Sequence, residues 1–160
     1  QGGGSSHINT DSVVSALETA VRKGRAVEYV KGFSSERDEM TEEELKHACE
    51  AAAGADAVVI FAGLPDSFES VGFDRNSMEL PKCQNRRIEA VAEIQMNVVV
   101  GIHNGSPVET PWAESVNAIL EMYLGGEGIG EASDRLLFGE ANPGGRRAES
   151  IPYRLEVTPC

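Results

Sequence analysis

Lysine and arginine are few in this sequence, and their scarcity excludes two classes of partner. The chain holds 14 of them against 26 aspartates and glutamates, which leaves a formal net charge of −12. Nucleic acids and anionic membrane surfaces attract proteins through clustered positive charge, so we expect neither as a partner. The excess of carboxylates indicates a solvated acidic surface and identifies no positively charged partner.

Cysteine is also scarce, and its spacing argues against a metal site. The three cysteines, Cys49, Cys83 and Cys160, are widely separated, and no Cys-x-x-Cys pair exists. No group of histidines, cysteines and carboxylates has the spacing of metal ligands, so we expect no metal and no other cofactor. Cys49 falls on the apolar face of an expected helix, where a buried free thiol is the ordinary state. Nothing in this pattern demands an oxidising compartment.

Long hydrophobic runs are absent as well. No apolar stretch approaches the ~20 residues that a membrane-spanning helix needs, and no signal peptide is visible. We therefore expect no membrane partner and favour the cytoplasm, while the compartment itself is not identified by the sequence. The chain begins with Gln1 rather than methionine, which indicates a processed or excised piece.

The expected elements alternate between strand and helix. The strands are Ala26–Val30, Ala57–Ala62, Asn97–Ile102 and Ala118–Leu124, with a last extended segment at Ile151–Val157. The first helix follows a cap at Thr10 or Asp11 and ends at Lys23–Gly24. The second runs from the capping box Thr41–Glu44 to Gly54, the third follows Leu80–Pro81, and the fourth spans Gly130–Phe138.

This alternation predicts an α/β fold. Strands that are continuous apolar runs are typical of a parallel sheet covered on both faces. Of the 160 residues, 41% are hydrophobic and 25% are charged, as in ordinary globular proteins. We therefore predict a flavodoxin-like, doubly wound sandwich with a mostly parallel sheet, formed by residues 1–160 as a single domain.

A charged loop follows the second expected strand. The stretch Gly63–Arg75 carries Asp66, Glu69, Asp74 and Arg75 directly after the apolar run Ala57–Ala62. Open α/β sheets place their ligand sites at the carboxyl ends of the strands. The position of the loop therefore predicts that it borders a functional site.

Six segments, in order, resemble the C-terminal α/β sandwich domain of glycoside hydrolase family 3. They are Gln1–Asn9, Phe61–Arg75, Met78–Pro81, Asn104–Glu109 with Pro111–Trp112, Tyr123–Gly126 and Leu137–Arg146. β-Glucosidases, β-xylosidases and related retaining exo-enzymes dominate that family. The resemblance covers nearly the whole chain, so it implies a β-glucosidase-like hydrolase of terminal β-linked sugars.

The resemblance also implies that part of the active site lies elsewhere. The catalytic aspartate of the family is on a preceding barrel domain, and its acid/base glutamate is in the loop that corresponds to Phe61–Arg75. A retaining glycosidase needs both carboxyl groups ~5–5.5 Å apart, and 160 residues cannot hold a further ~250-residue barrel. We expect a fragment that lacks the barrel and the family's first strand, and that is inactive alone.

The acid/base position itself departs from the family. Members commonly carry Glu-Gly-aromatic-Asp-Arg, whereas this chain has Val71-Gly72-Phe73-Asp74-Arg75. Valine has no proton to give. Glu69 is the nearest carboxylate and becomes the candidate catalytic residue, although in an extended stretch it would lie ~6–7 Å from position 71.

Other candidate residues have a functional and a structural interpretation. Ser5, Ser6 and His7 would bind substrate or form a tight turn, and Asp74 with Arg75 would bind substrate or, as we favour, pin the loop as an ion pair. His103 and Trp112 could face a sugar, but we expect a hydrogen-bonded structural histidine and a core or interface tryptophan. His47 lies among charged residues and is expected at the surface.

Two further hypotheses belong to different classes. A non-catalytic carbohydrate-binding or assembly module is consistent with Val71. A nucleotide- or flavin-binding domain is suggested by the fold alone, but Gly2–Gly4 lack the preceding strand that such a site requires. An uncovered sheet edge also predicts a homo-oligomer, because such edges recruit further strands. The identity of the sugar and its linkage stays open.

Overall fold

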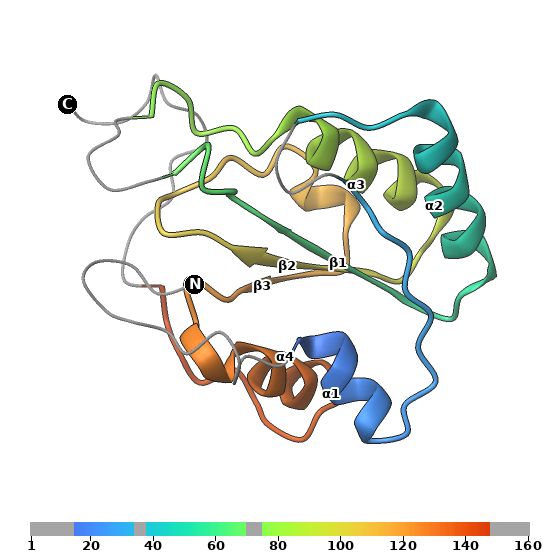
Figure 1. Ribbon diagram of the computed structural model, residues 1–160, viewed down its shortest axis with the longest axis vertical. Coiled ribbons are helices and arrows are strands. Elements are labelled where there is room, and N and C mark those ends of the chain that lie inside the picture. The colour runs from blue at the N-terminus through green and yellow to red at the C-terminus, as the bar shows by residue number, and fades with distance from the viewer. Residues whose placement is uncertain (1–14, 34–37, 70–74, 148–160) are drawn as a thin grey trace. The chain divides into compact units, whose positions relative to one another are not determined.

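The computed structural model describes residues 15–33, 38–69 and 75–147 (Figure 1). Residue contacts divide the chain into two compact units. Among the described residues, the sheet unit comprises 30–33, 38–69 and 75–121, and the helical unit comprises 15–29 and 122–147.

In the part of the chain that the structure describes, three parallel strands form the sheet, in the order β1-β2-β3 (Figure 1). They are β1 (Val58–Gly63), β2 (Val98–His103) and β3 (Ala118–Glu121). The expected parallel α/β fold is confirmed, and the first two strands lie within one residue of their predicted bounds. The third is shorter than the expected Ala118–Leu124, because Tyr123 has a φ of 50°, which no extended strand accommodates.

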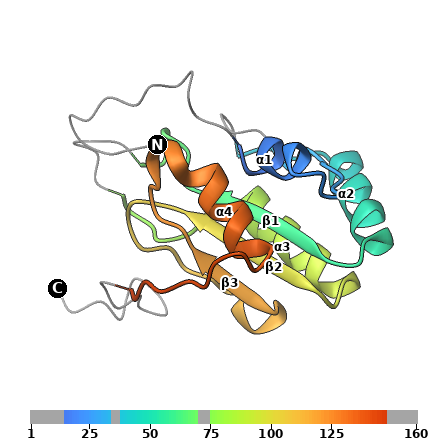
Figure 2. The same cartoon turned by 90° about the horizontal axis from the view of Figure 1, so that it is seen from below.

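Helices α2 (Glu42–Gly54) and α3 (Lys82–Ile94) pack together in the sheet unit (Figures 1 and 2). The predicted capping box of α2 is confirmed, since Thr41 Oγ1 accepts from Glu44 N at 3.1 Å and Glu44 accepts from Thr41 N at 2.7 Å. The core joins residues of both helices, the first two strands and the connections: Ala52, Ala62, Leu80, Ile88, Val91, Val98, Val100, Ile102, Val108 and Trp112.

The amino end of α3 is capped from a distance. Its N-cap residue, Pro81, makes no side-chain cap bond. Instead, the Asp38 carboxylate accepts from Lys82 N at 2.8 Å and from Cys83 N at 2.7 Å. Asp38 therefore satisfies two of the amide groups that a helix start leaves unpaired, and it ties its own segment to α3.

The helical unit pairs α1 (Ala16–Arg22) with α4 (Ile129–Leu137), which lie side by side in both ribbon views (Figures 1 and 2). The cap of α1 is Ser15, which forms a capping box with Glu18, rather than the expected Thr10 or Asp11. Those two residues lie outside the described ranges. The predicted end is confirmed, because α1 stops at Arg22 and Gly24 has a φ of +72°.

A buried carboxylate joins α1 to α4. Asp134, only 1% exposed, accepts from Lys23 Nζ at 2.8 Å and from Arg25 Nε at 3.4 Å. Glu140 binds the same two cations. The guanidinium of Arg25 also lies 3.9 Å from the centre of the Phe138 ring.

The strand expected at Ala26–Val30 was a wrong prediction. These residues have no regular secondary structure, and in the described part of the chain no strand pairs with them. Val27 and Tyr29 are 40% and 65% exposed. An apolar, β-branched run forms a strand only when packing and a neighbouring strand support it.

Within the described residues there are also two short 3₁₀ helices, η2 (Ala113–Ser115) and η3 (Gly126–Gly128). Within the described ranges, no helix combines the length and apolar character that crossing a membrane requires. The expected extended segment Ile151–Val157 lies outside these ranges.

Candidate active site

The carboxyl ends of β1 and β2 lie next to each other. Gly63 pairs in register with His103, and Leu64 N donates to His103 O at 3.1 Å. A Cβ atom on Gly63 would lie 2.1 Å from that same oxygen, so only glycine permits the approach. Gln84 on α3 binds both backbone groups of Gly63 at 2.9 Å, which fixes this edge of the sheet to the helix.

The candidate residue Glu69 lies just beyond this edge. A turn brings the chain round, with Phe68 N and Glu69 N both donating to Pro65 O. The Glu69 carboxylate then accepts from Gly105 N at 2.8 Å. The half-buried Glu69 side chain is therefore held by the turn that follows β2.

Arg75 binds the same turn. Its Nη1 donates to Ser106 Oγ at 2.9 Å and to Pro107 O at 3.3 Å, and its Nη2 donates to Glu79 O at 3.1 Å. Burial lowers the pKa of the Arg75 guanidinium, and the negative charge of Glu69 opposes that shift. The group stays protonated, since arginine titrates far above neutral pH.

The turn after β2 is itself firmly held. Asn104 is 1% exposed and its Nδ2 donates to Ser106 O at 2.8 Å. Val108 is fully buried, and Glu109 N donates to Met78 O at 2.8 Å. Residues 104–109 therefore form a well-anchored turn to which both Glu69 and Arg75 bind.

A shallow pocket of about 310 Å³ opens beside the loop. Its lining combines charged, hydroxyl, amide and apolar groups from Asp38, Ser67, Phe68, Arg75, Asn76, Ser77, Glu79, Leu80 and Lys82. Arg75 therefore contributes to the pocket wall while it holds the turn.

The structure brings together two of the residues that the sequence singled out, Glu69 and Arg75. Ser5, Ser6, His7, Val71 and Asp74 lie outside the described ranges. Sequence reasoning did not identify Gly105 and Ser106 as their partners. The only signal was the family-like run Asn104–Glu109, which says nothing of what it binds.

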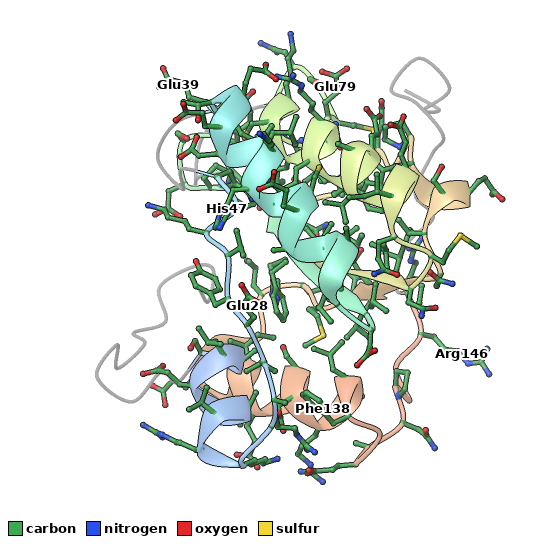
Figure 3. All side chains as sticks on the ribbon, turned by 90° about the vertical axis from the view of Figure 1, so that its right-hand side faces the viewer. Glu28, Glu39, His47, Glu79, Phe138 and Arg146 are labelled. Carbon is green, nitrogen blue, oxygen red and sulfur yellow. The ribbon has the colours of Figure 1, made fainter. Side chains whose placement is uncertain are left out.

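The structure also places three other residues that the sequence singled out. Trp112 is 2% exposed and donates to Asn85 Oδ1 at 2.8 Å, so it belongs to the core. The ring of His103 lies 5.8 Å from that of Phe61 in a tilted arrangement. His47 is exposed on α2 (Figure 3). Among the residues that the structure describes, no three His, Cys, Asp or Glu side chains are grouped so as to hold a metal ion.

Comparison with known proteins identifies a family. The sequence pattern of the "Glycosyl hydrolase family 3 C-terminal domain" matches residues 1–160. Thermostable beta-glucosidase B of Acetivibrio thermocellus is 47% identical over 162 residues, which cover 99% of this chain and 22% of that protein. An exo-alpha-(1->6)-L-arabinopyranosidase of Bifidobacterium longum is 38% identical over 160 residues, 99% of this chain and 21% of that protein.

Solved structures of beta-glucosidases also resemble this chain. A GH3 beta-glucosidase of Bifidobacterium adolescentis superimposes with a TM-score of 0.91 at 37% identity, over 98% of this chain and 23% of that one. A beta-glucosidase of Kluyveromyces marxianus in complex with glucose gives a TM-score of 0.71 at 36% identity, over 76% of this chain and 15% of that one. The chain spans less than a quarter of each of these relatives.

Proposed function

The chain belongs to glycosyl hydrolase family 3 as its C-terminal domain, and we propose that it forms one wall of the sugar pocket in a longer, retaining exo-β-glycosidase. The observation that carries the proposal is the match of the whole chain to this domain in β-glucosidases. The reaction is the hydrolysis of a terminal β-linked sugar.

Two carboxyl groups perform this reaction. A carboxylate attacks the anomeric carbon while an acid gives its proton to the departing oxygen, so the glycosidic bond breaks as a glycosyl ester forms. Water then attacks the ester and gives a proton to the second carboxylate, which releases the sugar with its configuration retained. The nucleophile lies on the barrel domain of the full enzyme, outside this chain.

Glu69 is the candidate acid/base of this domain. The family position holds Val71, which carries no proton, whereas the Glu69 carboxylate lies at the carboxyl edge of the sheet, 2.8 Å from Gly105 N. That edge is where open α/β sheets bind ligands. Asp74 and Arg75 support the loop, and Ser5, Ser6 and His7 are proposed to contact the sugar.

Activity measurements test the proposal directly. We expect no turnover of an aryl β-glucoside by the isolated 160-residue chain, because the carboxylate that attacks the anomeric carbon and forms the glycosyl ester lies on the barrel domain. The full-length polypeptide should hydrolyse it, and proton NMR should show β-glucose as the first product. Turnover by the purified chain alone, or α-glucose as the first product of the full-length protein, would contradict the proposal.

A non-catalytic carbohydrate-binding or assembly module is the second candidate, and the observation that favours it is Val71. Isothermal titration with glucose and cellobiose separates the two candidates. Measurable affinity for the sugar, together with a full-length protein that shows no turnover, would support the binding module.

The substrate itself needs a separate measurement. Close relatives bear the names of a β-glucosidase and of an α-(1→6)-L-arabinopyranosidase. We expect the full-length enzyme to prefer β-glucosides. A panel of aryl glycosides with matched leaving groups tests this, and preference for the arabinopyranoside would overturn it.

A further inference from the structure

We propose that Arg75 is a positioning residue, which holds the Glu69 carboxylate at the carboxyl edge of the sheet by binding the turn that also binds Glu69. The inference rests on the proposed function, because the place of this carboxylate matters for turnover only if Glu69 serves as the acid/base.

The contacts that carry the inference converge on three consecutive residues. Glu69 accepts from Gly105 N at 2.8 Å, while Arg75 donates to Ser106 Oγ at 2.9 Å and to Pro107 O at 3.3 Å. The two charged side chains also attract each other. Glu69 and Arg75, which flank the stretch 70–74, therefore both bind the short turn at residues 105–107.

The turn can hold Glu69 and Arg75 in place because it is itself anchored to the core. Asn104 and Val108 are 1% and 0% exposed, and Asn104 Nδ2 closes the turn on Ser106 O at 2.8 Å. A buried and hydrogen-bonded segment has little freedom to follow a misplaced side chain. Loss of the Arg75 contacts should therefore displace the charged loop rather than the turn.

Arginine suits this task better than lysine. Its planar fork presents donors in fixed directions, and here Nη1 reaches the turn while Nη2 reaches Glu79 O at 3.1 Å. A lysine ammonium would keep the attraction to Glu69 but could not reproduce both directions at once. Arg75→Lys should therefore still position the Glu69 carboxylate in part, and Arg75→Met should position it less well.

The test uses the full-length enzyme and two β-glucosides. 2,4-Dinitrophenolate leaves without a proton, whereas the sugar that departs from cellobiose must be protonated. General acid catalysis contributes about 10²–10⁴-fold, so Arg75→Met should lower kcat/KM for cellobiose by about 10-fold or more and change the dinitrophenyl substrate by less than about 3-fold. Arg75→Lys should fall between Arg75→Met and the parent.

Arg86→Met is the matched control. Arg86 makes an exposed ion pair with Glu42 at 2.7 Å, so its removal should leave both substrates unaffected. An equal loss on both substrates in Arg75→Met, or no loss on cellobiose, overturns the inference.

Glu69→Gln separates the failure of the inference from the failure of the proposed function. If the parent does not hydrolyse either glucoside, the proposed function fails. If Glu69→Gln loses cellobiose turnover selectively and Arg75→Met does not, only the positioning role of Arg75 fails. If Glu69→Gln shows no selectivity, Glu69 is not the acid and both assignments fail.

Hydrogen exchange provides a readout that does not need activity. In the 160-residue chain, the Gly105 amide donates to Glu69, so it should exchange about 10-fold faster in Arg75→Met as that bond opens more often. An unchanged exchange rate in a folded variant overturns the positioning role.

Discussion

Gly63 sets how closely the two strands that end at the candidate site can approach each other. A Cβ atom there would lie 2.1 Å from the His103 carbonyl oxygen, far inside any real contact. That oxygen accepts the first hydrogen bond beyond the sheet, from Leu64 N. The absence of a side chain at Gly63 therefore determines where the segment that leads to Glu69 leaves the sheet.

Gly63→Ala should destabilise the chain by about 1–3 kcal/mol, the usual range when a packed site is overfilled. Thermal or chemical unfolding measures the loss. Gly54→Ala is the control, because nothing lies within 4 Å of a Cβ at Gly54 and alanine favours the helix. A stable Gly63→Ala protein would show that the strands separate without cost.

Val71→Glu tests the departure from the family at the residue scale. A glutamate at position 71 would place a carboxyl group where the family resemblance implies the proton donor, while Glu69 stays in place. Because Glu69 already supplies the proton in the proposed mechanism, we expect cellobiose turnover by the full-length Val71→Glu enzyme to stay within about 3-fold of the parent. A rise of about 10-fold or more, within the range that general acids contribute, would place the acid at position 71 and contradict the assignment to Glu69.

At the scale of elements, helix ends depend on partners that are distant in sequence. Asp38 caps α3 from a segment more than 40 residues earlier. Burial alone would raise the pKa of Asp38, but the amide donors of Cys83 and Lys82 outweigh it and leave the pKa lowered. Burial of the Cys83 thiol, together with its hydrogen bond to Asp38, raises the pKa of this thiol to about 12, so it stays protonated at neutral pH.

Asp38→Ala should cost about 1 kcal/mol at neutral pH, as removal of a helix cap usually does. The lowered pKa means that the contribution of the charge is complete above the ordinary value of 3.8 and is lost as pH falls through the folded-state value. Unfolding of the parent, Asp38→Ala and Asp38→Asn at several pH values checks this. A difference between parent and Asp38→Asn that grows on acidification would contradict it.

The pairing of α1 with α4 depends on Asp134. Its burial opposes ionisation, but Lys23 and Arg25 outweigh that cost and lower the pKa of the carboxyl. Asp134→Asn should leave both cations without their buried partner and speed amide exchange in α1 and α4. Glu50→Gln, which breaks the exposed pair with Lys46 at 3.7 Å, is the control and should change little. Equal effects of the two variants would contradict the conclusion that the pairing of α1 with α4 depends on Asp134.

At the scale of the molecule, β1 is the edge of the described sheet, since it pairs with β2 on one side and with no other described strand. Val59 and Phe61 on β1 are 39% and 38% exposed. An unprotected, apolar edge strand recruits another chain. The homo-oligomer expected from the sequence therefore remains a prediction.

Sedimentation velocity of the 160-residue chain should therefore show dimers or larger species at micromolar concentration. Val59→Lys should shift the population towards monomer, because a lysine on an edge strand opposes pairing. A parent chain that sediments only as a compact monomer would refute the prediction.

Part of the site could be predicted from sequence because its signals are local. The apolar run before Gly63 and the charges after it identify a loop at the end of a parallel strand. The partners of that loop could not be predicted in the same way. Gly105 and Ser106 come 30 or more residues later, and no periodicity links them to Glu69 or Arg75.

The sequence by itself determined the parallel α/β class, the capping box at Thr41 and the family, since each depends on neighbours along the chain or on motif order. Only the tertiary structure decided that Asp38 caps α3, that Trp112 lies in the core rather than at an interface, and that Ala26–Val30 is no strand. These outcomes depend on long-range contacts. Which distant backbone groups come within hydrogen-bonding reach is fixed only when the chain packs.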